Sequence, residues 1–131
     1  MKNLYACPHC RTNLNPNVKI ILVASYRQRR GLILLSPRPG NFKFICDRPL
    51  AETITPGARV TFSCPVCAED LTAPGNQEFV ELHLAAPGVN LRRLYFSRTY
   101  GTHATFVDTG EEILAYGEDS REFDRVNFFG V

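Results

Sequence analysis

Residues 7–14 read CPHCRTNL and residues 64–71 read CPVCAEDL, two copies of the pattern Cys-Pro-x-Cys-x-x-(Asn or Asp)-Leu. Each copy places two cysteines in one tight turn, a spacing at which two thiolates can occupy one edge of a metal tetrahedron. The two copies together supply four sulfur ligands. The pattern therefore predicts that Cys7, Cys10, Cys64 and Cys67 hold one metal ion, which we expect to be a structural Zn²⁺.

The 53 residues between the pairs (63 − 10 = 53) do not argue against a shared site. The cost of closing a loop grows only logarithmically with its length, and a β-meander can bring its two ends together. A closed four-cysteine shell leaves no position for water or substrate, so we expect the metal to stabilise the fold rather than to catalyse. His9 lies inside the first turn, where we expect an exposed spacer.

The two Cys-Pro-x-Cys turns resemble the knuckles of the zinc-ribbon class. The resemblance covers about sixteen residues, and it implies a protein that binds nucleic acids or other proteins. Rubredoxin-type iron sites are similar, but they usually carry glycine directly after the second cysteine of each knuckle. This chain has Arg11 and Ala68 at those positions, so iron is the minor alternative.

Most of the remaining chain shows strand patterns, with apolar runs or alternating apolar and polar residues bounded by proline and glycine. These patterns predict a mainly β, small antiparallel domain. A basic turn at residues 27–31 joins the first two strands. The expected strands cover residues 18–26, 32–35, 42–46, 59–64, 79–84, 94–97, 104–107 and 111–116.

The length of 131 residues favours a single zinc-stabilised domain over the whole chain. In this interpretation, residues 17–62 form a β-hairpin insertion between the knuckles, and residues 78–131 form a C-terminal β region with a short helix. The helix is expected because Asp119 and Glu122 have the spacing of a capping box, with Phe123 and Val126 on one face.

The cysteine count and the apolar runs indicate the cellular compartment. Five is an odd number of cysteines, and four of them are too closely paired for the long-range bridges of secreted scaffolds, so we expect reduced thiols. The longest apolar runs are far below the roughly 20 residues that span a bilayer. The first residues lack the apolar core of a signal peptide. We therefore expect a cytoplasmic protein without a membrane span.

Charge divides the chain into two opposed halves. Residues 1–60 carry ten Lys or Arg and two acids (10 − 2 = +8), whereas residues 61–131 carry five Arg and eleven acids (5 − 11 = −6). One interpretation is a nucleic-acid surface on the basic half. The favoured interpretation is that the halves neutralise each other, within the fold or across a dimer.

Two groups of arginines are the best nucleic-acid candidates, because guanidinium groups bind phosphate and neighbouring aromatic rings can stack on bases. The first group lies at the expected hairpin tip, and the second lies beside Tyr95 and Phe96. The candidate residues are Arg27, Arg29, Arg30, Arg92 and Arg93.

The sequence contains few groups that suggest catalysis. Cys46 is an unpaired thiol, but it shares a strand face with Phe42 and Phe44, which favours a buried apolar role. The triplet at residues 108–110 matches the Asp-Thr-Gly of aspartic proteases, yet it is also good hairpin-turn chemistry. We therefore expect a non-enzymatic module that binds another protein or self-associates, with nucleic-acid binding and thiol or iron-based redox activity as the alternatives.

Overall fold

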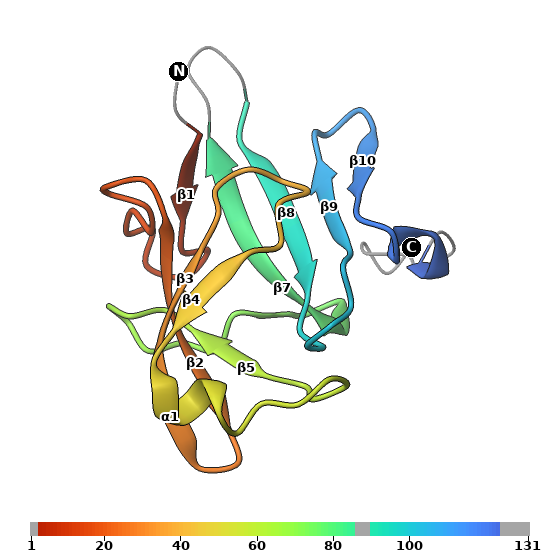
Figure 1. Cartoon of the computed structure of the whole chain (residues 1–131). Coiled ribbons are helices and arrows are strands. Elements are labelled where there is room, and N and C mark those ends of the chain that lie inside the picture. The colour runs from red at the N-terminus through yellow and green to blue at the C-terminus, as the bar shows by residue number, and fades with distance from the viewer. Residues whose placement is uncertain (1–2, 86–89, 124–131) are drawn as a thin grey trace.

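The computed structural model describes residues 3–85 and 90–123, which form two antiparallel β-sheets (Figure 1). The six-stranded sheet has the order β1 (Leu4–Ala6), β7 (Asn76–Ala85), β8 (Arg92–Ser97), β9 (Thr105–Asp108) and β10 (Ile113–Tyr116), and β6 (Thr72–Ala73) pairs with β7. The four-stranded sheet has the order β4 (Phe44–Cys46), β3 (Arg29–Leu35), β2 (Ile20–Tyr26) and β5 (Thr61–Ser63). The predicted mainly β, antiparallel fold is confirmed.

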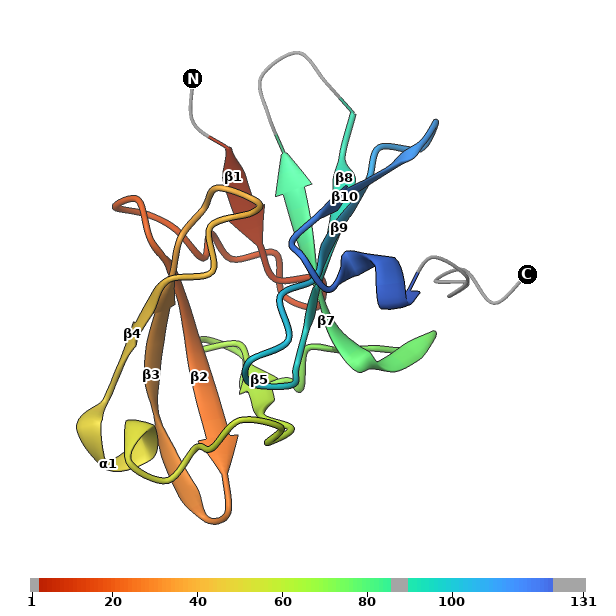
Figure 2. The ribbon, with the colours of Figure 1, turned by 45° about the vertical axis from the view of Figure 1, so that its right-hand side comes forward.

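The core lies between the two sheets, as the turned view shows (Figure 2). Alternate residues of each strand point inward because successive side chains of a strand face opposite sides of its sheet. From β2 the buried residues are Ile20, Leu22 and Ala24, and from β7 they are Val80, Leu82 and Leu84. These side chains belong to one apolar cluster, so each sheet buries its inner face on the other.

The hairpin between β2 and β3 is tighter than predicted. Its turn consists of Arg27 and Gln28 alone, and both have a left-handed φ, of 47° and 67°. Two such residues give a turn whose twist matches that of the flanking strands. The expected turn over residues 27–31 is therefore wrong in length, because Arg29 and Arg30 already pair with β2 as part of β3.

The predicted C-terminal helix is wrong: only a 3₁₀ turn, η1 (Ser120–Phe123), is present in that region of the described chain. Asp119 does not cap a helix, because its Oδ2 atom accepts a hydrogen bond from the backbone N–H of His103 at 2.8 Å. Phe123 packs against Phe79 and Phe106 on the outer face of the six-stranded sheet. Val126 lies outside the described residues.

One short helix was not predicted. It is α1 (Arg48–Ala51), which has a proline in its first turn and buries Leu50 against the core. Proline fits the first turn of a helix because its missing N–H would have no partner there. Both helical segments in the described part of the chain have four residues, far fewer than a membrane-spanning helix needs.

Candidate metal centre

The two knuckles lie where the chain crosses between the sheets. The first knuckle, residues 7–14, leaves β1 of the six-stranded sheet and leads to β2 of the four-stranded sheet. The second knuckle, residues 64–71, leaves β5 of the four-stranded sheet and leads to β6 and β7 of the six-stranded sheet. An ion held by both knuckles would therefore connect the two sheets at two crossings.

The structure brings the four predicted ligands into one cluster, in which all Sγ atoms lie within 4.8 Å of one another. The Sγ atoms of Cys7 and Cys67 are 3.7 Å apart, and those of Cys10 and Cys64 are also 3.7 Å apart. Four sulfurs about 2.3 Å from a tetrahedral zinc are about 3.8 Å from each other. The spacing matches a metal tetrahedron, and it is far longer than the roughly 2.05 Å of a disulfide.

Backbone hydrogen bonds hold the first cysteine of each knuckle in the same way. The Sγ atom of Cys7 accepts from the N–H groups of His9 and Cys10, at 3.3 and 3.5 Å. The Sγ atom of Cys64 accepts from Val66 and Cys67, at 3.4 and 3.5 Å. Such N–H groups stabilise the negative charge of a thiolate, so both turns are prepared to bind a cation.

Arg11 and Ala68, the residues after the second cysteines, have φ angles of 64° and 66°. This left-handed conformation favours glycine, because a Cβ atom crowds the backbone there. It also allows the Arg11 N–H to bond to the carbonyl of Cys7, at 2.9 Å, and the Ala68 N–H to that of Cys64, at 3.0 Å. The absence of glycine at these two positions therefore does not alter the turn, and it does not distinguish a zinc site from an iron site.

The four thiols differ in their surroundings. Cys7 and Cys64 are buried, Cys67 is half-buried and Cys10 is exposed. Burial raises the pKa of the Cys7 thiol to about 12, whereas a hydrogen bond from the backbone of Thr12 lowers the pKa of Cys10. A bound metal favours the thiolate form of its ligands, so binding must release a proton from Cys7.

The structural repeat is longer than the repeat in the sequence. Tyr5 corresponds to Phe62, because their carbonyls accept from the N–H groups of Leu14 and Leu71, both at 2.8 Å. Asn13 and Asp70 also correspond, since each accepts a bond from the backbone two residues later. The correspondence of Asn13 and Asp70 was already visible in the sequence, whereas that of Tyr5 and Phe62 was not, because these two share backbone bonding and an aromatic side chain rather than an identical residue.

Asn15 is a buried residue that the sequence analysis did not single out. Its Oδ1 atom accepts from the N–H of Tyr5 at 2.8 Å, and its Nδ2 atom donates to the carbonyl of Asn3 at 2.9 Å. The side chain thus fastens the end of the first knuckle to β1. The sequence contained no signal for this role, because Asn15 lies in a polar stretch between Asn13 and Asn17 and nothing local distinguishes it from them.

The other candidate thiol and the protease-like triplet have structural roles. Cys46 is half-buried beside the core, and burial raises the pKa of its thiol, which makes it a poor nucleophile. Asp108 accepts a hydrogen bond from the N–H of Gly110 at 2.8 Å, in the turn that joins β9 and β10. The hairpin interpretation of residues 108–110 is therefore the observed one. His9 is exposed, and the sulfur cluster does not include it.

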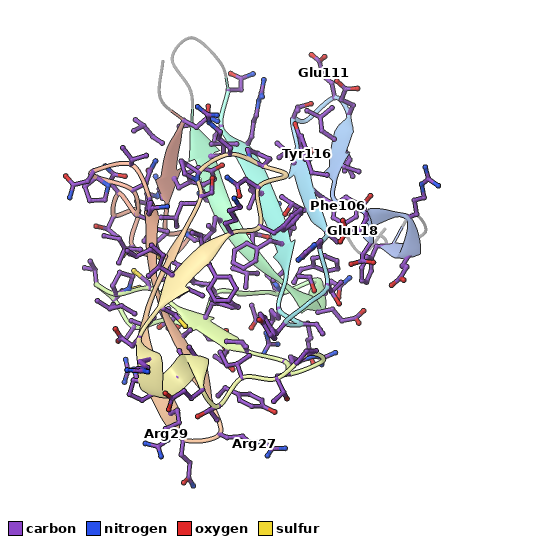
Figure 3. All side chains as sticks on the ribbon, viewed as in Figure 1. Arg27, Arg29, Phe106, Glu111, Tyr116 and Glu118 are labelled. Carbon is purple, nitrogen blue, oxygen red and sulfur yellow. The ribbon has the colours of Figure 1, made fainter. Side chains whose placement is uncertain are left out.

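The two arginine groups lie on different sheets at opposite ends of the molecule. Arg27, Arg29 and Arg30 surround the β2–β3 turn, where the first two extend into solvent (Figure 3). Arg92 and Arg93 begin β8, next to the far ends of β1 and β7 (Figure 1). The structure does not bring these five residues together into one surface.

The opposed charges remain mostly separate within the fold. Among the described residues, Arg59 and Glu78 form the one ion pair that joins the basic and acidic halves, at 3.8 Å and with both side chains half exposed. Figure 3 shows Glu111 at the tip of the β9–β10 hairpin, far from Arg27 and Arg29. Direct ion pairing between the two halves within the described fold is therefore limited to this pair, and neutralisation across a dimer, the other form of the favoured interpretation, stays a prediction.

Comparisons with known proteins identify no relative. No protein-family model matches this chain, no curated protein matches it, and no solved structure matches it. The assignment of the site therefore depends on its own chemistry: four cysteine sulfurs within 4.8 Å of one another, two pairs of them 3.7 Å apart, on two equivalent turns that connect two sheets.

Proposed function

We propose that the four cysteines bind one structural zinc ion, and that the protein is a non-enzymatic module that binds another protein. The support for zinc is the donor set, because Zn²⁺ forms closed tetrahedral shells with four thiolates. A closed shell leaves no position for a substrate. The ion would act on the fold instead, by holding together two sheets that share one core.

The observation that supports protein binding is an apolar surface on the outer face of the four-stranded sheet, which we call the aliphatic face. It consists of Ile21, Val23, Leu32, Leu34 and Ile45. The residues are cross-strand neighbours: Leu34 pairs with both Ile21 and Ile45, and Val23 pairs with Leu32. Leu32 and Ile45 are exposed and the other three are half-buried. Contiguous apolar residues that remain accessible to solvent mark interaction surfaces in soluble proteins.

The aliphatic face is open to solvent at its centre and at its edge. Leu32 is 48% exposed and Ile45 is 58% exposed, although both lie in regular strands. In addition, β4 is an edge strand of its sheet. A partner could therefore cover the face and pair with the backbone of β4, as in other complexes that add a strand to a sheet.

Charge around the aliphatic face indicates the kind of partner. The basic β2–β3 turn, with Arg27, lies at one end of the same sheet. A partner that complements this sheet would have an apolar surface with acidic residues at its rim. A second copy of this chain offers acidic residues at the β9–β10 turn, Glu111 and Glu112, so self-association is the first case to test.

The zinc proposal is tested by elemental analysis of untagged protein purified without added metal or chelator. One zinc per chain supports the proposal. A coloured, reducible iron centre would contradict it and would make electron transfer the leading function. If the protein folds without any metal, the zinc proposal is wrong and thiol redox activity of the four cysteines becomes the leading alternative.

The interaction proposal is tested by sedimentation over a range of protein concentrations, at low and high salt. We expect an oligomer that Leu32→Glu dissociates, because a buried carboxylate without a partner opposes association. Leu4→Glu is the matched control, since Leu4 is 45% exposed on β1 of the other sheet, away from the acidic β9–β10 turn. Two results together would argue against the aliphatic face as an interface. The protein would be a monomer at all concentrations, and the wild-type and Leu32→Glu proteins would capture the same proteins from native lysate.

A second candidate function is nucleic-acid binding through the β2–β3 turn. It is favoured by the exposure of Arg27, Arg29 and Arg30, none of which forms an ion pair with a described residue. This function predicts binding that weakens steeply with added salt, because phosphate contacts release counterions. Filter binding that is absent even at low salt rejects it.

A further inference from the structure

A cavity of about 140 Å³ lies between the two sheets, away from the sulfur cluster. Its floor consists of inward-facing core residues from both sheets, among them Ile20, Ile33, Leu94 and Phe96. None of the four cysteines lines it. The cavity is thus separate from the candidate metal centre, and the two sites can be tested independently.

Aromatic side chains form the walls near the mouth of the cavity. The ring of Phe42 stacks on His103, with ring centres 4.6 Å apart and planes 8° apart. Phe44 contacts Tyr100 edge to face, with centres 5.8 Å apart. Each pair joins the segment before or within β4 to the loop between β8 and β9.

The size and lining of the cavity suit one small apolar group. An apolar cavity of about 150 Å³ stays dry and accepts a molecule of the size of benzene. The floor of this cavity is aliphatic and aromatic, so water inside it would find few polar partners. A planar six-carbon ring matches both the volume and the aromatic walls.

The charges at the mouth are of one sign. Arg38 and Lys43 both line the cavity and are exposed, and neither forms an ion pair with a described residue. The described residues that line the cavity include no Asp or Glu. Glu118 and Asp119 lie outside the lining and bond to His103: Glu118 Oε1 to Nδ1 at 2.7 Å, and Asp119 Oδ2 to the backbone N–H at 2.8 Å. On the side of Arg38 and Lys43, the mouth therefore favours an anionic group over a cationic one.

We propose that this cavity is a binding site for a small organic anion, in which an apolar ring of about six carbons enters the space between the sheets and a carboxylate remains at the mouth beside Arg38 and Lys43. The proposal does not depend on the aliphatic face or on protein binding. Benzoate is the simplest probe with this chemistry. Benzyl alcohol and benzylammonium keep the ring and replace the anion with a neutral and a cationic group.

The test is a titration of the metal-loaded full chain with each of the three probes, followed by amide NMR shifts and calorimetry. We expect saturable binding of benzoate, with the largest shifts at residues that line the cavity. Benzyl alcohol should bind more weakly, and benzylammonium weakest of all. The double variant Arg38→Gln/Lys43→Gln should weaken benzoate about threefold to fivefold and leave benzyl alcohol unchanged. Arg27→Gln/Arg48→Gln, which removes two exposed charges that do not line the cavity, is the matched control.

A second pair of variants tests the cavity itself. Ile33→Phe should fill the space and abolish the binding of benzoate and benzyl alcohol alike, whereas Ile33→Val should retain both. Metal content and the amide spectrum show whether the Ile33→Phe variant is folded. If that variant is unfolded, Leu94→Phe is used to fill the cavity instead. Equal affinity for benzoate and benzylammonium, or shifts confined to residues outside the cavity, would overturn the proposal. So would the absence of saturable binding of all three probes.

Discussion

The first knuckle and the second knuckle differ at four of their eight positions, yet they form the same backbone structure. Their N–H to Sγ distances are 3.3 and 3.5 Å in one and 3.4 and 3.5 Å in the other. The shared side chains are the two cysteines, the proline and the leucine. The comparison teaches that backbone hydrogen bonds and a buried leucine define this turn, and that the intervening side chains are free to vary.

The surroundings of the two knuckles are not equivalent. The first extends from the six-stranded sheet and the second from the four-stranded sheet. Cys10 is exposed, whereas the corresponding Cys67 is half-buried. If one ion is shared, each knuckle should nevertheless be equally necessary, because two sulfurs alone cannot complete the shell. Substitutions at matching positions of the two knuckles test this equivalence.

The largest effect should follow the loss of one ligand from either knuckle. We expect Cys7→Ser and Cys64→Ser each to lose the zinc and to unfold at physiological temperature, since structural zinc sites supply about 10–16 kcal/mol of apparent binding energy. Metal analysis and thermal unfolding measure both effects. Cys46→Ser is the control and should keep its metal. If one of the two ligand variants retains a full zinc, the ion is not shared.

Removal of the leucine from each knuckle should have the next largest effect. Leu14 and Leu71 are both 1% exposed, so Leu14→Ala and Leu71→Ala should each lower the free energy of unfolding by about 2–5 kcal/mol. Guanidinium titration of the metal-loaded protein measures this loss. Val66→Ala, at a residue 69% exposed, should change stability by less than about 0.5 kcal/mol. A large difference between the two leucines would mean that only one knuckle packs on the core.

Glycine after the second cysteine should stabilise both knuckles modestly. Arg11→Gly and Ala68→Gly relieve a left-handed conformation, and the gain is reduced by the greater freedom of glycine in the unfolded chain. We expect an increase of about 0.5–1 kcal/mol in each case. Chemical denaturation measures it. Thr12→Gly, one residue further on and without a positive φ, should be destabilising, and a gain at that position would remove the conformational explanation.

The smallest effect should come from the residue between the cysteines. His9 and Val66 are both exposed and both donate a backbone N–H to a sulfur. Exchanging the side chains, as His9→Val and Val66→His, should leave zinc content unchanged and alter stability by less than about 0.5 kcal/mol. Thermal unfolding at neutral pH is sufficient to measure this. Loss of metal in His9→Val alone would show that this histidine is a ligand.

Corrections to the sequence analysis occur where contacts between distant residues compete with a local preference. Asp119 has the spacing of a helix cap, but it bonds instead to the backbone of His103, sixteen residues away. In the β2–β3 turn, residues 29–31 pair with β2, which takes three residues from the expected loop into the strand. Local patterns contain no information about a partner sixteen residues away, so the first difference could not be predicted. The second depends on the left-handed φ of Arg27 and Gln28, which residues other than glycine rarely adopt.

The sequence alone was sufficient to predict the four-cysteine cluster and the class of fold. Both follow from short-range chemistry: a Cys-x-x-Cys turn sets the spacing of two sulfurs, and residues that alternate along a strand lie on opposite faces of a sheet. Three features became visible only in the folded protein: the knuckles connect two sheets, Leu32 and Ile45 share an open face, and Ile33 and Leu94 line one cavity. These features depend on which strands pair and how the sheets pack, and pairing between segments far apart in the chain is chosen by the total burial of the fold.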